Sequence, residues 1–145
     1  MIYQSVGALV RDQETISLNP QATVQEAAEL MAAHRVGAVP VIERDGHLCG
    51  IFTERDLLNR VIAKRLSPEA VHLTEVMTAD PITAGVGASL TSCLKIMLKH
   101  RFRHLPLLQG EQVVGVLSCR DIPADYWLML QNWEAAQTEL LSATA

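Results

Sequence analysis

Two short stretches of the sequence carry the same combination of chemically active side chains. The stretch that starts at Gly50 reads GIFTERDL, and the stretch that starts at Gly115 reads GVLSCRDI. We call them the first and the second octet. A hydroxyl group and the backbone N–H groups of a helix N-terminus can bind phosphate, and an aspartate one turn later can accept hydrogen bonds from paired sugar hydroxyls. The octets can therefore bind a sugar phosphate.

The same residues also allow an interpretation that needs no ligand. A Thr or Ser followed three residues later by an acid is a variant of the capping box, in which two side chains satisfy free N–H groups at the start of a helix. Thr53 with Asp56, and Ser118 with Asp121, have this spacing. On this interpretation the octets only start helices, and their glycines give bends in strands.

The arginine of each octet favours a ligand. Arg55 and Arg120 fall in the first turn of the predicted helices. In that position the helix dipole disfavours a cation by about 0.3–1 kcal/mol. Because both copies carry this unfavourable charge, we expect a negative group close to each arginine.

The octets belong to a repeat that runs through most of the chain. When the second half is aligned with the first, Pro40 in HRVGAVPVI matches Pro106 in HRFRHLPLL, and the octets match at a shift that is shorter by one position. Each copy predicts an extended piece, a helix that begins after Thr23 or Ser89, two strands joined by a hairpin, and a second helix at the octet. A proline in the first of these strands favours a sheet edge or a bulge.

This order predicts an α/β (α+β) fold of two tandem β-α-β-β-α repeats. Because a copy of about 60 residues buries little apolar surface alone, we expect the copies to pack through their sheets, with pseudo-twofold symmetry and two equivalent clefts. The helix after the second octet would break at Pro123 and restart near Asp125. We predict one compact module with these parts: repeat 1 at 5–65, a linker at 66–80, the core of repeat 2 at 81–122 and a C-terminal helical extension at 123–145.

The composition excludes several classes of protein. The net charge is −4 and the pI about 5.7, without a basic run, which argues against a nucleic-acid-binding protein. No apolar run reaches the roughly 18 residues that span a bilayer, and the N-terminus lacks a signal-peptide pattern. The three cysteines lie in apolar patterns typical of reduced thiols. We therefore expect a cytoplasmic protein with no membrane association.

The octets and the strands before them resemble the cystathionine-β-synthase-type (CBS) domain, here as a tandem pair or Bateman module. The segments VGAVPVI and GIFTERDL, then FRHLPLL and GVLSCRDI, match the family pattern, and the resemblance covers about residues 5–122. It implies a stand-alone regulatory or sensor module, not an enzyme, with adenosine-containing ligands such as AMP, ADP, ATP or S-adenosylmethionine in the clefts. Occupancy would be transmitted to a partner protein that the sequence does not identify.

The resemblance also implies roles for individual residues. It places a ribose-binding aspartate at Asp56 and Asp121, a hydroxyl that contacts ribose or phosphate at Thr53 and Ser118, and phosphate-side arginines at Arg55 and Arg120. It places the adenine pocket around Ile16, Ser17, Ala38 and Val39 in one repeat and around Ile82, Thr83, His104 and Leu105 in the other. No catalytic cofactor is implied, because the adenine nucleotide, with or without Mg²⁺, is a regulatory ligand.

The two clefts are expected to differ. Arg103 and His104 stand where the first repeat has Gly37 and Ala38. We expect their side chains to reach phosphate beside the second octet, and the two clefts to bind ligand with different affinities.

Other residues that could do chemistry have simpler explanations. His100 and His104 have the spacing of helical metal ligands, but the repeat places them on different elements, and Arg101 and Arg103 would repel a cation. Cys119 has no histidine–acid pair that would support nucleophilic catalysis. We therefore expect neither a metal site nor a catalytic site.

Two alternatives concern the tail and the function as a whole. The tail is either a helix packed on its own module or a contact in a homodimer, in which case deletion of 126–145 would give a monomer. Its apolar residues have near-helical spacing: Tyr126, Met129, Leu130, Trp133, Ala136, Leu140 and Leu141. The alternative to a sensor is a ligand-free interaction or dimerisation module that keeps the octets as helix caps.

Overall fold

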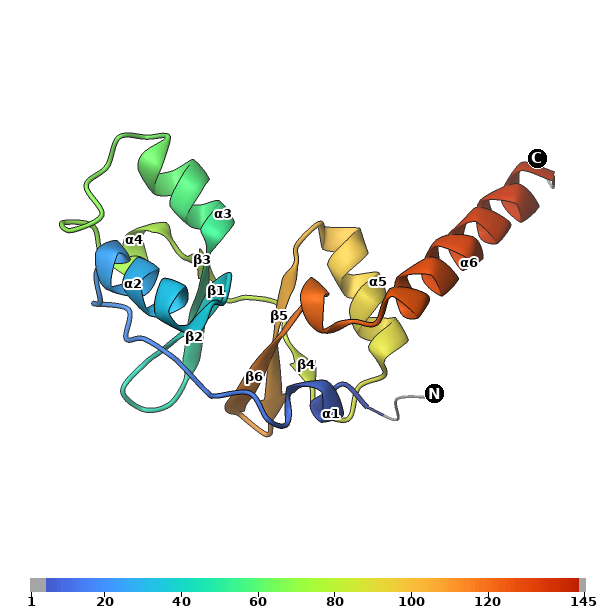
Figure 1. Ribbon diagram of the computed structural model, residues 1–145, viewed down its shortest axis with the longest axis horizontal. Helices are drawn as coiled ribbons and strands as arrows, with labels where there is room; N and C mark the ends of the chain where they lie inside the picture. Colours follow the sequence, from blue (N-terminus) through green and yellow to red (C-terminus); the bar gives the residue numbers. More distant parts are fainter. Residues whose placement is uncertain (1–4, 144–145) are drawn as a thin grey trace.

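The chain folds into two similar lobes, one for each repeat, followed by a long C-terminal helix (Figure 1). The computed structural model describes residues 5–143, apart from some side chains of that helix: Leu130, Trp133, Glu134, Ala136, Gln137, Leu140 and Ala143. Each lobe contains a three-stranded sheet with helices packed against it. This architecture confirms the α/β fold of two repeats with a C-terminal helix.

The first lobe combines the first repeat with the segment that follows it. Its sheet has the order β1-β2-β3, and both strand pairs are antiparallel. The segment predicted as a linker therefore contributes a helix and the third strand. The elements are α2 (Val24–His34), β1 (Ala38–Ile42), β2 (Leu48–Thr53), α3 (Glu54–Asp56), the π-helix η1 (Leu57–Ile62), α4 (Leu73–Val76) and β3 (Thr78–Ala79).

The second lobe repeats this plan. Its sheet has the order β4-β5-β6, with β4 parallel to β5 and β6 antiparallel to β5. The parallel pair of Ala84 with Leu107 corresponds, in the alignment that matches Pro40 with Pro106, to a parallel bridge of Leu18 with Val41 in the first lobe. The elements are β4 (Ala84–Gly85), α5 (Leu90–His100), β5 (His104–Gln109), β6 (Gln112–Ser118) and the 3₁₀ turn η2 (Cys119–Asp121).

The two strand prolines have different surroundings. Pro40 lies in β1, at the edge of its three-stranded sheet, whereas Pro106 lies in the central strand β5, so of the two predicted alternatives only a bulge can apply to Pro106. A register shift follows each proline. Strand β4 pairs with β5 only at Leu107 and Leu108, so on that side the sheet needs no N–H from Pro106.

The long helices start and end as local rules predict. The hydroxyls of Thr23 and Ser89 each accept, at 3.1 Å, the backbone N–H three residues further on, and so cap α2 and α5. Arg35 and Arg101 end the same helices in the left-handed conformation, with φ of 55° and 57°. These stops direct the chain into β1 and β5, the strands that enter the clefts.

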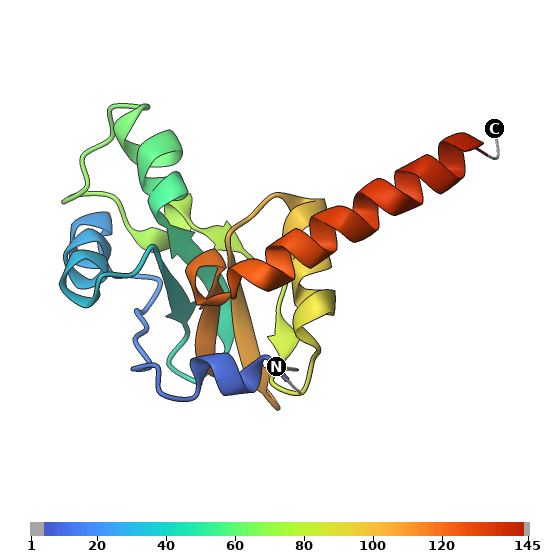
Figure 2. The ribbon, with the colours of Figure 1, turned by 45° about the vertical axis from the view of Figure 1, so that its right-hand side comes forward.

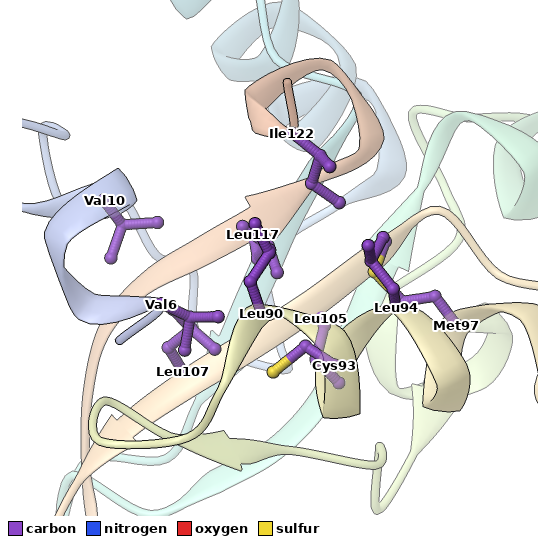
Figure 3. Packing of buried hydrophobic residues seen from close by; sticks show 10 residues of the cluster. All are labelled: Val6, Val10, Leu90, Cys93, Leu94, Met97, Leu105, Leu107, Leu117 and Ile122. Atoms are coloured by element: carbon purple, nitrogen blue, oxygen red, sulfur yellow. The ribbon is translucent and has the colours of Figure 1, made fainter. Parts of the chain in front are cut away.

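Each lobe has its own hydrophobic core, and the N-terminal segment packs into the core of the second. Val6 and Val10, at the start and end of the short helix α1 (Gly7–Val10), lie among buried residues of α5, β5 and β6 (Figure 3). In sequence this segment is the start of the predicted repeat 1, which spans residues 5–65. The boundaries given above for the two repeats remain a prediction. In the folded chain, residues 6–10 pack with the second lobe.

The element after each octet differs between the repeats. In the first, α3 continues into η1, and in the second the 3₁₀ turn stops before Pro123 and α6 (Ala124–Ala143) begins. This confirms the predicted break and restart. Both ribbon views show α6 extending away from the two lobes (Figures 1 and 2). Tyr126 and Trp127 pack against the second core, while Leu128 and Met129 are 59% and 53% exposed.

Candidate functional site

Both octets form the capping box that their spacing predicts. The Thr53 hydroxyl accepts the Asp56 N–H at 3.2 Å, and the Asp56 carboxylate accepts the Thr53 N–H at 3.0 Å. At the second octet the Asp121 carboxylate accepts the Ser118 N–H at 2.8 Å. The ligand-free interpretation is therefore correct for the local structure. It does not exclude a ligand, because an ionised carboxylate can accept several hydrogen bonds at once.

The negative group expected near Arg55 is a helix C-terminus. Arg55 Nη1 donates to the carbonyl oxygen of Arg101 at 3.0 Å, and Arg101 is the residue that ends α5. Carbonyl groups at a helix C-terminus carry partial negative charge. The contact therefore offsets the unfavourable position of Arg55 in its own helix, and it joins the first octet to the second lobe.

A second arginine, which the sequence analysis missed, holds the first octet from the other side. Arg60 Nε lies 3.6 Å from Asp56 Oδ1, and Arg60 Nη1 donates to the carbonyls of Val76 and Met77 at 3.2 and 2.9 Å. The sequence feature that could have identified Arg60 is its position four residues after Asp56, which brings the two side chains together on a helix. Asp125 has that position in the second repeat, so the two copies carry opposite charges at this position of the sequence.

The octet glycines make room for other parts of the chain. A Cβ at Gly50 would overlap the side chain of Met77, and a Cβ at Gly115 would lie 3.0 Å from both Gln13 Oε1 and Val10 Cβ. Gly50 and Gly115 are not among the glycines with positive φ. The predicted role as strand bends is therefore replaced by close approach of a neighbouring segment.

Replacing Gly50 by alanine is expected to lower the free energy of unfolding by about 1 kcal/mol, because the added Cβ displaces the flexible side chain of Met77. Equilibrium unfolding in urea measures the change. Gly87→Ala is the matched control, since a Cβ there meets nothing within 4 Å. Equal unfolding free energies of the two variants would contradict the close-approach explanation.

The first octet opens into the larger of two clefts between the lobes. The larger cleft has a volume of about 650 Å³, which lies within the range of about 300–1,000 Å³ common for small-molecule sites. Four arginines face three carboxylates in its wall, so it suits an anionic ligand. Its charged lining residues are Arg55, Arg60, Arg101, Arg103, Glu54, Asp56 and Asp80, and Thr53, Ile82, His100 and His104 are among the others.

The second octet opens into the smaller cleft, which has a volume of about 270 Å³. Two arginines and two carboxylates line it, so their charges balance. These are Arg35, Arg120, Glu14 and Asp121, and they share the wall with Gln13, Thr15, Ile16, Gly37, Ala38, His104 and Ser118. The two clefts therefore differ in volume and charge.

Each octet faces the opposite repeat. The first octet shares the larger cleft with Ile82 and His104 of the second repeat, and the second octet shares the smaller cleft with Ile16 and Ala38 of the first. Arg103 lines the larger cleft with the first octet, while its carbonyl accepts the Cys119 N–H of the second octet at 3.0 Å. The start of β5 therefore lies between the two octets, because His104 pairs with Ser118 and lines both clefts.

Four of the predicted adenine-pocket residues lie outside the linings of both clefts. Val39 and Leu105 are fully buried in the two cores, and Ser17 and Thr83 do not line either cleft. Side chains alternate along a strand, so the residue after Ala38 or His104 points to the opposite face of its sheet.

His104 lines both clefts. Burial lowers the pKa of its imidazole below the ordinary value of 6.5, Arg120 and Arg103 act in the same direction, and Glu54 and Asp121 oppose them. The ring is therefore neutral at pH 7 and offers each cleft a hydrogen-bonding group without charge.

The other candidate groups lie in ordinary surroundings. His100 stacks on Phe102 with ring centroids 6.0 Å apart, and within residues 5–143 no group of three or more His, Cys, Asp or Glu is arranged to hold a metal ion. Burial raises the pKa of the Cys119 thiol, which reduces the nucleophilic thiolate fraction. Within the same residues, no helix has the length and apolar character to cross a bilayer.

The model of the CBS domain matches residues 6–63 and 73–122 of this chain. The chain belongs to the CBS-domain family. The two matched ranges each contain one octet, so the chain is a tandem CBS pair, and the clefts described above lie between its two CBS repeats.

Known proteins similar to this CBS pair differ in length. The CBS domain-containing protein YhcV of Bacillus subtilis is 33% identical over 109 residues, which cover 75% of this chain and 76% of that protein. The CBS domain-containing protein CBSCBSPB2 of Arabidopsis thaliana is 35% identical over 108 residues, and this chain spans only 20% of its length. The structure of a CBS domain protein from Pyrobaculum aerophilum, complexed with AMP, is 28% identical, with a TM-score of 0.78 and coverage of 88% of this chain and 98% of that one.

Proposed function

We propose that this CBS pair is a regulatory module that binds an adenosine-containing ligand between its lobes and transmits the occupancy to a partner protein. The observation that carries the proposal is the pairing across the lobes, in which the aspartate and hydroxyl of each octet share a cleft with an apolar residue of the opposite repeat. Carboxylate and hydroxyl suit a ribose, and an apolar wall suits an adenine ring. The AMP complex of the similar Pyrobaculum protein supports this ligand class.

The larger cleft is the proposed site of the phosphorylated ligand. Arg55, Arg101 and Arg103 reach it from both lobes, and guanidinium groups bind phosphate oxygens through paired hydrogen bonds. We therefore assign AMP, ADP or ATP, with or without Mg²⁺, to the larger cleft. The smaller cleft, with balanced charges and less volume, would take no more than a nucleoside or a nucleoside monophosphate.

The signal would be a shift between two arrangements of the lobes. A ligand changes such an equilibrium only through different affinities for the two states. The contact of Arg55 with the α5 C-terminus joins the lobes beside the larger cleft, so a phosphate that competes for Arg55 would alter the junction. The nucleotide acts as a regulatory ligand in this scheme, and we expect ATP to be recovered unchanged after incubation with the protein.

Thermal unfolding with a panel of nucleotides tests the proposal. AMP, ADP, ATP or S-adenosylmethionine should raise the midpoint, because a ligand at a hundred times its Kd adds about 2.7 kcal/mol to the folded state. GMP and inorganic phosphate are the controls for the base and for the phosphate alone. An unchanged midpoint with every adenosine compound would contradict the proposal.

One observation favours a second candidate function, a ligand-free interaction module. The capping boxes give Thr53 and Asp56, and Ser118 and Asp121, complete structural roles without any ligand. If no adenosine compound binds, this role is the remaining explanation of the octets.

We further propose that the module forms a homodimer through α6. Leu128 and Met129 are mostly exposed on a helix that extends away from the lobes (Figure 2), and exposed apolar side chains of this kind are common in protein interfaces. The predicted face from Leu130 onward includes side chains outside the described residues. In the proposed dimer, α6 of one chain would pack against α6 of the second chain.

Deleting residues 128–145 is expected to convert the dimer into a monomer. This deletion is better than one from 126, because it leaves Tyr126 and Trp127 in contact with the second core. Light scattering coupled to size-exclusion chromatography measures the mass, and unfolding in urea verifies that the lobes stay folded. An unchanged assembly mass would contradict a dimer through α6.

A further inference from the structure

Within residues 5–143, the second sheet lacks a strand that the first sheet has. In the first lobe β3 pairs with β2, with Ala79 opposite Gly50. In the alignment that matches Pro40 with Pro106, the counterpart of Ala79 is Gln13, and the described residues around Gln13 form no strand with β6. The outer edge of β6 next to the smaller cleft therefore has no strand partner in the described part of the chain.

A side chain fills the place of that strand. The Gln13 amide donates through Nε2 to the Val116 carbonyl and accepts the Val116 N–H at Oε1, both at 2.9 Å. A carboxamide has the donor and the acceptor of a peptide group, so this pair of bonds reproduces one backbone pair of an antiparallel ladder. Gly115 leaves the space for it, because a Cβ there would lie 3.0 Å from Gln13 Oε1.

The residues held in this way are part of the smaller cleft. Gln13, Glu14, Thr15 and Ile16 all line it, and we call residues 13–16 the strap. Val10, buried in the second core, anchors the strap on one side, since its carbonyl accepts the Gln13 N–H at 3.0 Å. On the other side Glu14 lies 3.1 Å from His34 Nδ1 at the end of α2 in the first lobe. The strap thus runs from one lobe to the other across the smaller cleft.

We infer that Gln13 is a positioning residue for the smaller cleft, whose side-chain amide replaces the missing third strand and holds the strap as one wall of the ligand site. The inference rests on the proposed function, because it assigns Gln13 a role in ligand binding at that cleft. Gln13 acts through Ile16 and the strap backbone, which line the smaller cleft together with Ser118 and Asp121. The larger cleft does not depend on Gln13. Its corresponding wall, at residues 78–82, is held by the backbone pairing of β3 with β2.

The test compares Gln13→Met with wild type. Methionine has a similar length but neither the donor nor the acceptor of the amide. Gln112→Met is the control, because Gln112 is an exposed glutamine on the same strand as Val116. Hydrogen exchange of the Val116 amide is measured without nucleotide, and an AMP titration followed by NMR reports the affinity of each cleft separately, through the amides of Ser118 and Ile16 for the smaller and of Thr53 and Ile82 for the larger.

The expected result for Gln13→Met is at least tenfold faster exchange at Val116 and at least tenfold weaker AMP binding at the smaller cleft, with the larger cleft unchanged. Unchanged exchange at Val116, or faster exchange with unchanged smaller-cleft affinity, would overturn the inference. Equal losses at both clefts would also overturn it, since they indicate general destabilisation. A wild-type protein that does not bind AMP at the smaller cleft would instead refute the proposed function there, and the role of Gln13 in ligand binding with it.

Discussion

The Asp56→Ala variant is expected to bind AMP at the larger cleft at least tenfold more weakly than the wild-type protein. Asp56 is 7% exposed, and its carboxylate lies beside Arg60 at the wall of the larger cleft. Hydrogen bonds to a charged acceptor contribute about 1.5–3 kcal/mol each, and about 1.4 kcal/mol corresponds to a tenfold change in Kd. Calorimetric titration with AMP measures the affinity.

The same substitution removes a helix cap, so a control must separate the two effects. Loss of a cap lowers stability by about 1 kcal/mol. Asp45 in the β1–β2 turn also accepts a backbone N–H, from His47 at 2.9 Å, and lies outside the linings of both clefts. Asp45→Ala should therefore lose some stability and keep its AMP affinity. If Asp56→Ala also keeps its affinity, the assignment of Asp56 to ribose is wrong and only the cap remains.

The Val6→Asp variant is expected to lose about 3–5 kcal/mol of unfolding free energy, the usual cost of an uncompensated charge in a core. Val6 is 0% exposed, lies among the buried residues of the second lobe (Figure 3), and donates its N–H to the carbonyl of Ala88 at 3.0 Å. Unfolding in urea measures the loss. Ala8→Asp is the matched control, because Ala8 is exposed on the same helix α1.

This variant also tests where the N-terminal segment belongs. If α1 is part of the second core, hydrogen exchange in Val6→Asp should accelerate first at amides of the second lobe, such as Leu105 and Leu117. Amides of the first lobe, such as Val39 and Phe52, should keep their protection longer. Preferential loss in the first lobe, or equal stability of Val6→Asp and Ala8→Asp, would contradict the crossing of the chain between the cores.

Features set by neighbours in the sequence could be predicted from it. Thr23 and Ser89 cap their helices, and Pro123 follows the short turn within the second octet and prevents its continuation, because each acts on backbone groups within a few residues. The octets form capping boxes for the same reason. The internal repeat then predicted the two lobes and the pair of antiparallel strands that each contains.

Features set by distant parts of the chain could not be predicted in the same way. Arg103 faces the first octet, α1 packs on the second lobe, and Gln13 binds Val116, which is 103 residues away. Each depends on which lobe a segment reaches after folding, and a spacing pattern along the sequence does not contain that information. Gly115 does indicate that another segment approaches closely, since its missing Cβ makes room for Gln13. A glycine alone does not identify which segment that is.

The central claim, that adenosine ligands bind between the two lobes, is tested most directly by following the backbone amide signals of the nucleotide-free protein during an AMP titration. Saturable shifts are expected at Thr53, Asp56, Ile82 and His104, which line the larger cleft and come from both repeats. Absence of saturable shifts, or shifts confined to residues that line neither cleft, such as Asn19 and Arg44, would contradict this binding site.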